Sequence, residues 1–315
     1  MSFTGNEFEP TTGGVTFHHR PQLRAEDLIL PPGLLGKVEQ QVIDLGLRRD
    51  AMRRAGQHLK RGVLLYGPPG TGKTHTVRYL LSRSAGTTAI LLSAGSLALV
   101  AEAARMARAL QPSIVVLEDC DLVAEDRGFG PGSQPLLFEL LEAMDGLDAD
   151  ADVAFVLTTN RVESLERALA QRPGRVDLAV EIPKPGQDER RALLDLYAGS
   201  LGFSAKALDH AAVETAGTTA SFTKELVRRA VLAAALQDRD VADADLEAAV
   251  RELMAAESAL TRSLLGAGDT DPDGDGDGFR DSGGTSGALA MGSSFGWFPS
   301  SGGPAGAPGF TDEEQ

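Results

Sequence analysis

One run of eight residues carries the most specific chemistry in the chain: residues 67–74 read Gly-Pro-Pro-Gly-Thr-Gly-Lys-Thr, the pattern GxxxxGK[ST]. Its glycines can adopt positive φ, so that successive backbone N–H groups turn inward around a phosphate. Lys73 would place a positive charge on the β- and γ-phosphates, and the Thr74 hydroxyl can ligand Mg²⁺. We therefore predict a nucleotide site formed by Gly67, Pro68, Pro69, Gly70, Thr71, Gly72, Lys73, Thr74 and the next residue, His75.

Two adjacent acids, Glu118 and Asp119, follow an apolar segment downstream of this loop. Such a pair typically places one carboxylate near the water ligands of Mg²⁺ and the next near the attacking water. By position we assign Glu118, with Thr74, to the metal ion and Asp119 to activation of the water. Asn160 follows another apolar segment, and we expect its amide to orient the same water. The alternative, a pair of acids that simply faces solvent, is disfavoured beside so complete a loop motif.

These side chains need a scaffold that brings several strand ends together. Apolar segments alternate with helical patterns, and we predict strands at 63–66, 89–93, 113–117, 153–158 and 178–182. Strands and helices alternating at this spacing predict a parallel sheet with right-handed crossovers. A helix that opens at Thr74 would aim the positive end of its dipole at the bound anion. The expected fold class is α/β, a P-loop NTPase with a five-stranded parallel sheet between helices.

The character of the sequence changes along the chain and predicts four parts. Residues 1–27 show no periodicity, and we expect a flexible N-terminal arm. The α/β nucleotide-binding domain would span 28–186 and begin with a helix near 34–47. Four helical patterns without a strand pattern follow Pro185-Gly186 and predict a small helical lid domain at 187–264. Residues 265–315 are rich in Gly, Ser, Pro and Asp, which predicts a disordered acidic tail.

Charge and composition limit the class of partner and the compartment. The net charge is −15, and the tail from Gly266 onward carries −8 of it, so the body is mildly acidic. Such a body lacks the basic surface that binds nucleic acid. A single cysteine, Cys120, fits a reducing compartment. The chain has no apolar leader and no run of eighteen apolar residues, so we expect a cytoplasmic protein without a membrane anchor.

Five motifs occur in an order and spacing similar to those of AAA ATPases of the classic clade. They are GPPGTGKT at 67–74, IVVLEDCD at 114–121, TTN at 158–160, RPGRVD at 172–177 and TAGTTASFTKEL at 215–226. This resemblance to a single AAA module covers about residues 28–264. It implies Mg-ATP hydrolysis by a homo-oligomeric ring, commonly a hexamer, that remodels a protein substrate or binds an adaptor. It also implies that Arg175 is an arginine finger that reaches the γ-phosphate held by the neighbouring subunit.

Three departures from the family pattern keep a second interpretation open. The family usually has Asp-Glu where this chain has Glu118-Asp119, and Leu178 stands where a second arginine is common. The segment 94–101 lacks the aromatic residue of a substrate-threading loop. The exchanged acids would shift the catalytic carboxylates, and about 1 Å of misplacement can cost on the order of 10²-fold in rate. Together the three departures favour a slow- or non-hydrolysing, nucleotide-gated assembly module. A DNA-directed member of the family is disfavoured by the acidic charge.

Overall fold

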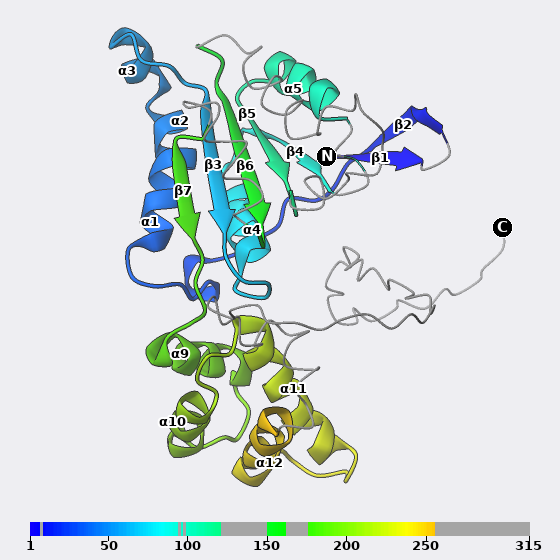
Figure 1. Ribbon diagram of the computed structural model, residues 1–315, viewed down its shortest axis with the longest axis vertical. Helices are drawn as coiled ribbons and strands as arrows, with labels where there is room; N and C mark the ends of the chain where they lie inside the picture. Colours follow the sequence, from blue (N-terminus) through cyan, green and yellow to red (C-terminus); the bar gives the residue numbers. More distant parts are fainter. Residues whose placement is uncertain (7–8, 94–95, 97–98, 121–149, 162–175, 256–315) are drawn as a thin grey trace, which may run out of the picture. The chain divides into compact units, whose positions relative to one another are not determined.

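The computed structural model describes residues 1–6, 9–93, 96, 99–120, 150–161 and 176–255 of the 315-residue chain (Figure 1). They form a twisted sheet covered by helices and, further along the chain, a group of four helices. No helix in this part of the chain is long and apolar enough to cross a membrane.

The sheet has seven strands in the order β2-β1-β4-β5-β6-β3-β7. The five predicted strands are all present, pair in parallel and confirm the expected α/β fold class. They are β3 (Arg61–Tyr66), β4 (Thr88–Leu92), β5 (Ser113–Leu117), β6 (Val153–Thr159) and β7 (Leu178–Glu181). Every residue of β5 and β6 is buried, as expected of central strands in a parallel sheet with helices on both faces.

The prediction of a flexible arm at residues 1–27 is wrong for its first half, which adds two strands to the sheet. β1 (Ser2–Asn6) pairs in parallel with β4 through Ser2 and Leu91, and β2 (Glu9–Thr16) pairs antiparallel with β1. The physical reason is that an exposed edge strand such as β4 presents backbone N–H and C=O groups that another segment can satisfy. Because backbone groups are common to all residue types, a polar sequence does not indicate this kind of strand pairing.

The second half of this segment is held on a helix by Arg20. Its guanidinium donates hydrogen bonds to the backbone oxygens of Leu81 (2.6 Å), Ser84 (2.9 Å) and Thr87 (2.5 Å). Two of these oxygens belong to the last turn of α4 (Lys73–Arg83) and the residue after it, where helical carbonyls lack partners within the helix. A short 3-10 turn, η1 (Ala25–Asp27), then precedes the helical stretch that begins at Leu34.

Helices cover both faces of the sheet (Figure 1). One face packs against α4 and against the helical stretch that was predicted at 34–47, with Val63 and Leu65 of β3 in this core. The opposite face packs against α5 (Val100–Ala109), with Leu64 in that core. The alternation of β3 side chains between the two cores follows from the two-residue period of a strand. The stretch at 34–47 consists of α1 (Leu34–Glu39), a π-helical turn η2 (Gln40–Asp44) and α2 (Leu45–Leu47), followed by α3 (Arg49–Arg54).

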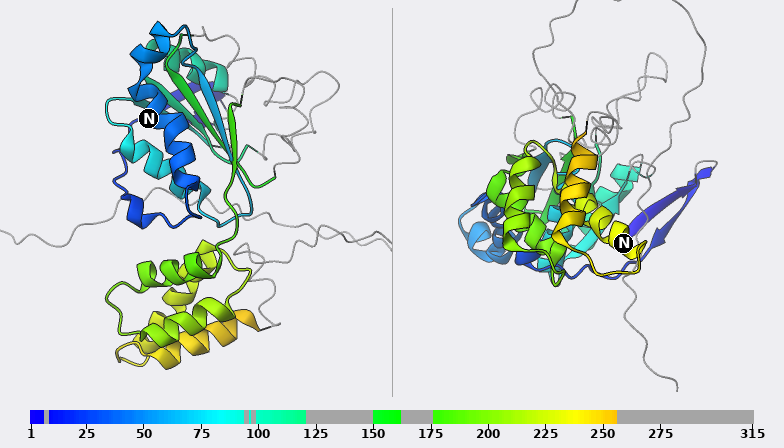
Figure 2. Two further views of the ribbon diagram at one scale, coloured as in Figure 1. Left: turned by 90° about the vertical axis from the view of Figure 1, so that its left-hand side faces the viewer. Right: turned by 90° about the horizontal axis from the view of Figure 1, so that it is seen from below.

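The helices predicted after Gly186 are also present and share a core of their own (Figure 2). They are α9 (Gln187–Ala198), α10 (Ala205–Glu214), α11 (Ala220–Ala235) and α12 (Asp243–Met254). Phe222 and Leu226 of α11 are fully buried in this core. The side chain of Thr219 caps α11 by accepting a hydrogen bond from the backbone N–H of Phe222. The domain boundaries stay predictions, and the proposed tail lies outside the described residues.

Candidate functional site

The predicted site residues converge because three neighbouring parallel strands end at one edge of the sheet. In β3 and β6, Tyr66 pairs with Thr159, so Gly67 and Asn160 are the next residues on adjacent strands. In β5 and β6, Leu117 pairs with Leu157, which puts Glu118 beside Thr158. The carboxyl edge of an open parallel sheet is where ligands of α/β proteins generally bind. The sequence order β3, β5, β6 thus becomes the spatial order β5, β6, β3 around one site.

The three loop glycines have the conformations that their residue type allows. Gly67, Gly70 and Gly72 have φ of 132°, 77° and 113°. Two of them are also confined by close neighbours: a Cβ on Gly67 would lie 2.4 Å from the backbone oxygen of Ile182, and one on Gly70 would lie 2.9 Å from Ser221 Oγ. At these two positions the loop therefore needs glycine for its backbone conformation and for space.

Lys73 lies inside the loop and is only 6% exposed. Its Nζ donates to the backbone oxygens of Gly67 and Pro68, each at 2.7 Å, and the Thr71 hydroxyl donates to the same Pro68 oxygen at 3.0 Å. A buried ammonium needs such partners because removing it from water is costly. Lys73 is also the first residue of α4, so the positive charge and the helix N-terminus lie at one place. This arrangement suits a phosphate group.

Thr74 and Glu118, the two predicted magnesium ligands, are joined by a side-chain hydrogen bond. Burial raises the pKa of Glu118, and the negative charge of Asp119 raises it further, whereas the Thr74 hydrogen bond and the charge of Arg78 act in the opposite direction. One hydroxyl and one carboxylate are the kind of oxygen ligands that Mg²⁺ takes from a protein when phosphates and water complete its shell. Within the described ranges no cluster of three or more His, Cys, Asp or Glu could hold a metal ion alone.

Asp119, two residues after the end of β5, has a left-handed backbone conformation, with φ of 54°. Its backbone N–H donates to Thr158 Oγ1 at 3.1 Å, and the N–H of Cys120 donates to the backbone oxygen of Thr158 at 2.9 Å. Asn160 lies two residues after Thr158, directly after β6, and is half-buried. The two groups assigned to the attacking water are therefore attached to strand ends that lie side by side. Thr158 was not among the predicted site residues.

His75 has a lowered pKa, mainly because burial disfavours the charged imidazole. The positive charges of Arg78 and Lys224 lower the pKa further, and Asp27 acts in the opposite direction. These charges come from three separate parts of the sequence: η1, α4 and α11. A neutral imidazole at neutral pH suits contact with an uncharged part of a nucleotide better than contact with phosphate.

One predicted residue lies outside the described part of the chain, and a further contact was not predicted from the sequence. Arg175, the predicted arginine finger, is outside the described residues. The further contact is a hydrogen bond of 3.0 Å from the backbone N–H of Ser221, in the first turn of α11, to the backbone oxygen of Gly70. Because both groups belong to the main chain, no residue type signals this contact.

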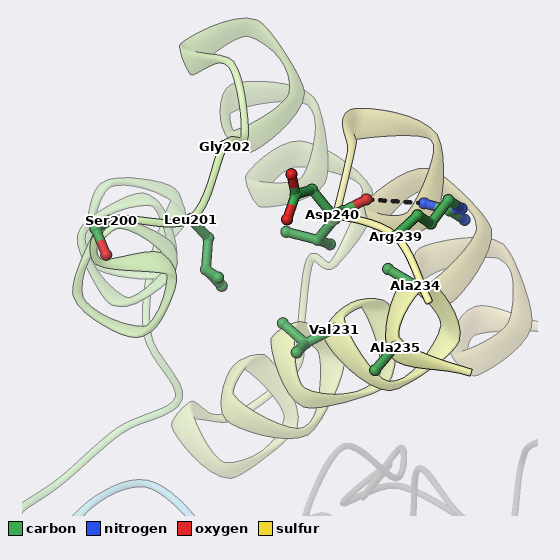
Figure 3. Close-up of a pocket in the computed structure, with 9 residues that line it drawn as sticks. Ser200, Leu201, Gly202, Val231, Ala234, Ala235, Arg239 and Asp240 are labelled. Atoms are coloured by element: carbon green, nitrogen blue, oxygen red, sulfur yellow. Dashed lines mark hydrogen bonds between the residues drawn. The ribbon is translucent and has the colours of Figure 1, made fainter. Parts of the chain in front are cut away.

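A pocket of about 450 Å³ lies among the helices after Gly186 and is separate from these strand ends (Figure 3). It lies between the loop after α9 and the C-terminal end of α11, and Leu201, Val231 and Val241 contribute its apolar wall. The Arg239 guanidinium at its rim binds the Asp240 backbone oxygen and the Asp245 carboxylate. None of the predicted site residues lines this pocket.

Comparison with known proteins agrees with the geometry. Residues 63–184 match the family described as "ATPase family associated with various cellular activities (AAA)". A proteasome-activating nucleotidase of Methanothermobacter thermautotrophicus is 30% identical over 274 residues, which cover 80% of this chain and 65% of that protein. An ATP-dependent zinc metalloprotease, FtsH 2 of Sorangium cellulosum, is 33% identical over 241 residues, 71% of this chain and 39% of that protein. This chain therefore spans less than two thirds of the length of both curated relatives.

Proposed function

We propose that this chain, which belongs to the AAA family of ATPases, binds Mg-ATP in the loop after β3 and hydrolyses it at the adjoining ends of β5 and β6. The observation that carries the proposal is the convergence of the following groups at one place. A buried Lys73 lies within a glycine loop at a helix N-terminus, Thr74 is bonded to Glu118, and Asp119 is the next residue. Binding of phosphate and activation of water need such groups together.

Each residue has a defined role in the proposed reaction. Lys73 and the loop N–H groups hold the β- and γ-phosphates, and Thr74 with Glu118 holds Mg²⁺, which would neutralise charge on the phosphate oxygens. Asp119 accepts a proton from the water that attacks the γ-phosphate, and Asn160 orients that water. Arg175 stabilises the transition-state charge on the nucleotide held by the next subunit.

We further propose that the chain works as a homo-oligomeric ring, a hexamer, that remodels a protein partner in the cytoplasm. The relatives named as a proteasome-activating nucleotidase and as an ATP-dependent metalloprotease support a protein partner. The acidic body of the chain argues against nucleic acid as that partner.

A second candidate function is a nucleotide-gated assembly module that hydrolyses ATP very slowly or not at all. The order Glu118-Asp119 favours it, because the acid assigned to the attacking water is one methylene shorter, and the acid assigned to the metal ion one methylene longer, than in the usual Asp-Glu order. Both candidates bind Mg-ATP, so the rate of turnover distinguishes them.

The deciding experiment is the steady-state ATPase rate with Mg²⁺ as a function of protein concentration, with Arg175→Ala and Asp119→Asn measured in parallel. For the ring ATPase the rate per subunit rises with concentration and collapses in both variants, while both still bind ATP. Tight binding of ATP by the wild type without turnover would reject the enzyme and leave the module. Lys73→Ala is the control in which ATP binding itself is lost.

A further inference from the structure

We propose that Thr158 is a positioning residue for Asp119: its hydroxyl holds the backbone of Asp119 in the conformation from which the carboxylate reaches the attacking water. This inference rests on the proposed ATP hydrolysis and extends it to a residue outside the predicted site. It is carried by the backbone conformation of Asp119 and by the two hydrogen bonds that end on Thr158.

The conformation of Asp119 is unusual for a residue with a side chain. Among the described non-glycine residues only Asp119 and Asp238 have positive φ, and Asp238 belongs to the turn after α11. The left-handed region costs an L-residue free energy, and Asp is one of the few types that tolerates it. Asp119 adopts it at the end of a buried strand, so the surrounding structure must stabilise it.

Thr158 supplies that stabilisation through two acceptors. Its hydroxyl oxygen accepts the N–H of Asp119 at 3.1 Å, and its backbone oxygen accepts the N–H of Cys120 at 2.9 Å. Thr158 is 1% exposed, so its hydroxyl is held among buried neighbours. The preceding residue, Glu118, still donates its N–H to Leu92 of β4 in the ordinary manner of the sheet. The chain therefore leaves the regular sheet pattern at Asp119, whose N–H donates to the Thr158 side chain and not to a backbone oxygen.

This conformation matters for chemistry because the aspartate side chain is short. With a single methylene between Cα and the carboxylate, the position of the oxygens depends mainly on the direction of the Cα–Cβ bond, which the backbone dihedrals set. Loss of the Thr158 hydroxyl would remove the acceptor of the Asp119 N–H and favour a return of Asp119 to ordinary φ. The carboxylate would then move away from the water, whereas Lys73, Thr74 and the loop glycines would keep their places.

The test compares Thr158→Val, which replaces the hydroxyl by a methyl group of similar size, with Thr158→Ser, which keeps the hydroxyl. We expect Thr158→Val to lower kcat on the order of ten-fold or more, with the Kd for Mg-ATP unchanged within about two-fold, and Thr158→Ser to retain most of kcat. Thr215→Val is the matched control. Thr215 is equally buried, and its hydroxyl binds the backbone oxygen of Ala211 in α10, so we expect kcat to stay near wild type.

A double-mutant cycle with Asp119→Asn separates positioning from general destabilisation. If Thr158 acts through Asp119, Thr158→Val costs little further turnover in the Asp119→Asn background, because the carboxylate is already absent. Equal losses in both backgrounds, or a parallel loss of Mg-ATP affinity in Thr158→Val, would overturn the proposal. So would a kcat of Thr158→Val within two-fold of wild type.

Amide hydrogen exchange of the nucleotide-free protein distinguishes failure of this inference from failure of the proposed function. We expect Thr158→Val to increase the exchange rate of the Asp119 amide by ten-fold or more, while the Val156 amide on β6 stays protected. A wild type that binds ATP without turnover would reject the proposed hydrolysis and with it the catalytic purpose of the contact. Unchanged exchange at Asp119 in an active Thr158→Val variant would reject the contact alone.

Discussion

Gly67, the first glycine of the phosphate loop, lies directly against the backbone of Ile182 at the end of β7, so that a Cβ at position 67 would lie 2.4 Å from the Ile182 oxygen. The backbone N–H of Ile182 in turn donates to the backbone oxygen of Tyr66 at 2.7 Å, and this hydrogen bond holds the two segments together. The loop therefore depends on a strand that begins more than a hundred residues later in the sequence.

Replacing Gly67 by alanine should damage folding and binding together. The new methyl group would clash with a backbone oxygen, and φ of 132° is outside the range that alanine adopts readily. We expect a loss of about 1–3 kcal/mol in the free energy of unfolding and loss of ATP binding. Thermal unfolding and titration with a fluorescent nucleotide measure the two effects.

The control for this prediction is Gly36→Ala in α1. Gly36 has space around it and no positive φ, so alanine there should stabilise the helix by roughly 0.5–1 kcal/mol. A Gly67→Ala protein as stable as Gly36→Ala, with normal affinity for nucleotide, would contradict the described contact.

The ion pair between Arg61 and Asp152 should be the most sensitive charged pair of the sheet. Their side chains are 4% and 3% exposed and lie 2.8 Å apart, and Arg61 also donates to the backbone oxygens of Leu59 and Val42. Asp152→Ala should cost about 3–5 kcal/mol, because it leaves the buried guanidinium without its counter-charge. Chemical denaturation measures this loss. Glu102→Ala, which breaks the exposed pair with Arg105, should cost less than about 1 kcal/mol.

Removal of the Arg20 side chain should loosen the N-terminal segment from α4. Arg20→Ala leaves the Leu81 and Ser84 oxygens without these donors, and we expect a loss of about 1–2 kcal/mol in stability. Amide exchange should also rise at Leu91, whose N–H donates to Met1 at the junction of β1 and β4. Protection of Leu91 identical to wild type would show that the two ends of the segment are independent.

Glu118→Gln should stabilise the protein at neutral pH while it removes magnesium-dependent turnover. Because burial raises the folded-state pKa of Glu118 above its ordinary value of 4.5, the folded state retains the proton over a range in which the unfolded state has lost it. Stability due to this group therefore falls as pH rises through that range and stays reduced above it. Glutamine has no charge to bury, so the gain in stability of Glu118→Gln over wild type should be largest at neutral pH.

The measurement is the unfolding midpoint of Glu118→Gln and wild type between pH 7.5 and pH 5, without nucleotide. The difference between the two should shrink as the pH approaches the ordinary carboxyl value. A variant less stable than wild type at pH 7.5 would contradict the assigned direction of the pKa shift.

Much of this protein follows from local sequence. The loop at 67–74, the acids at 118 and 119 and the five apolar segments predicted the nucleotide site, the parallel sheet and the order of its helices, because each depends on residues close together in the chain. A glycine loop followed by a helix, or a strand that ends in acids, is specified by composition over fewer than ten residues.

Tertiary structure decided the features that depend on backbone groups from distant segments. The pairing of β1 with β4, the bond from Ser221 to Gly70 and the contact of Gly67 with Ile182 all involve main-chain atoms, which every residue type carries. The left-handed Asp119 and its bond to Thr158 became visible only once β5 and β6 were aligned in register. Sequence named the groups to which we assign the chemistry, and long-range backbone packing determined how they are held.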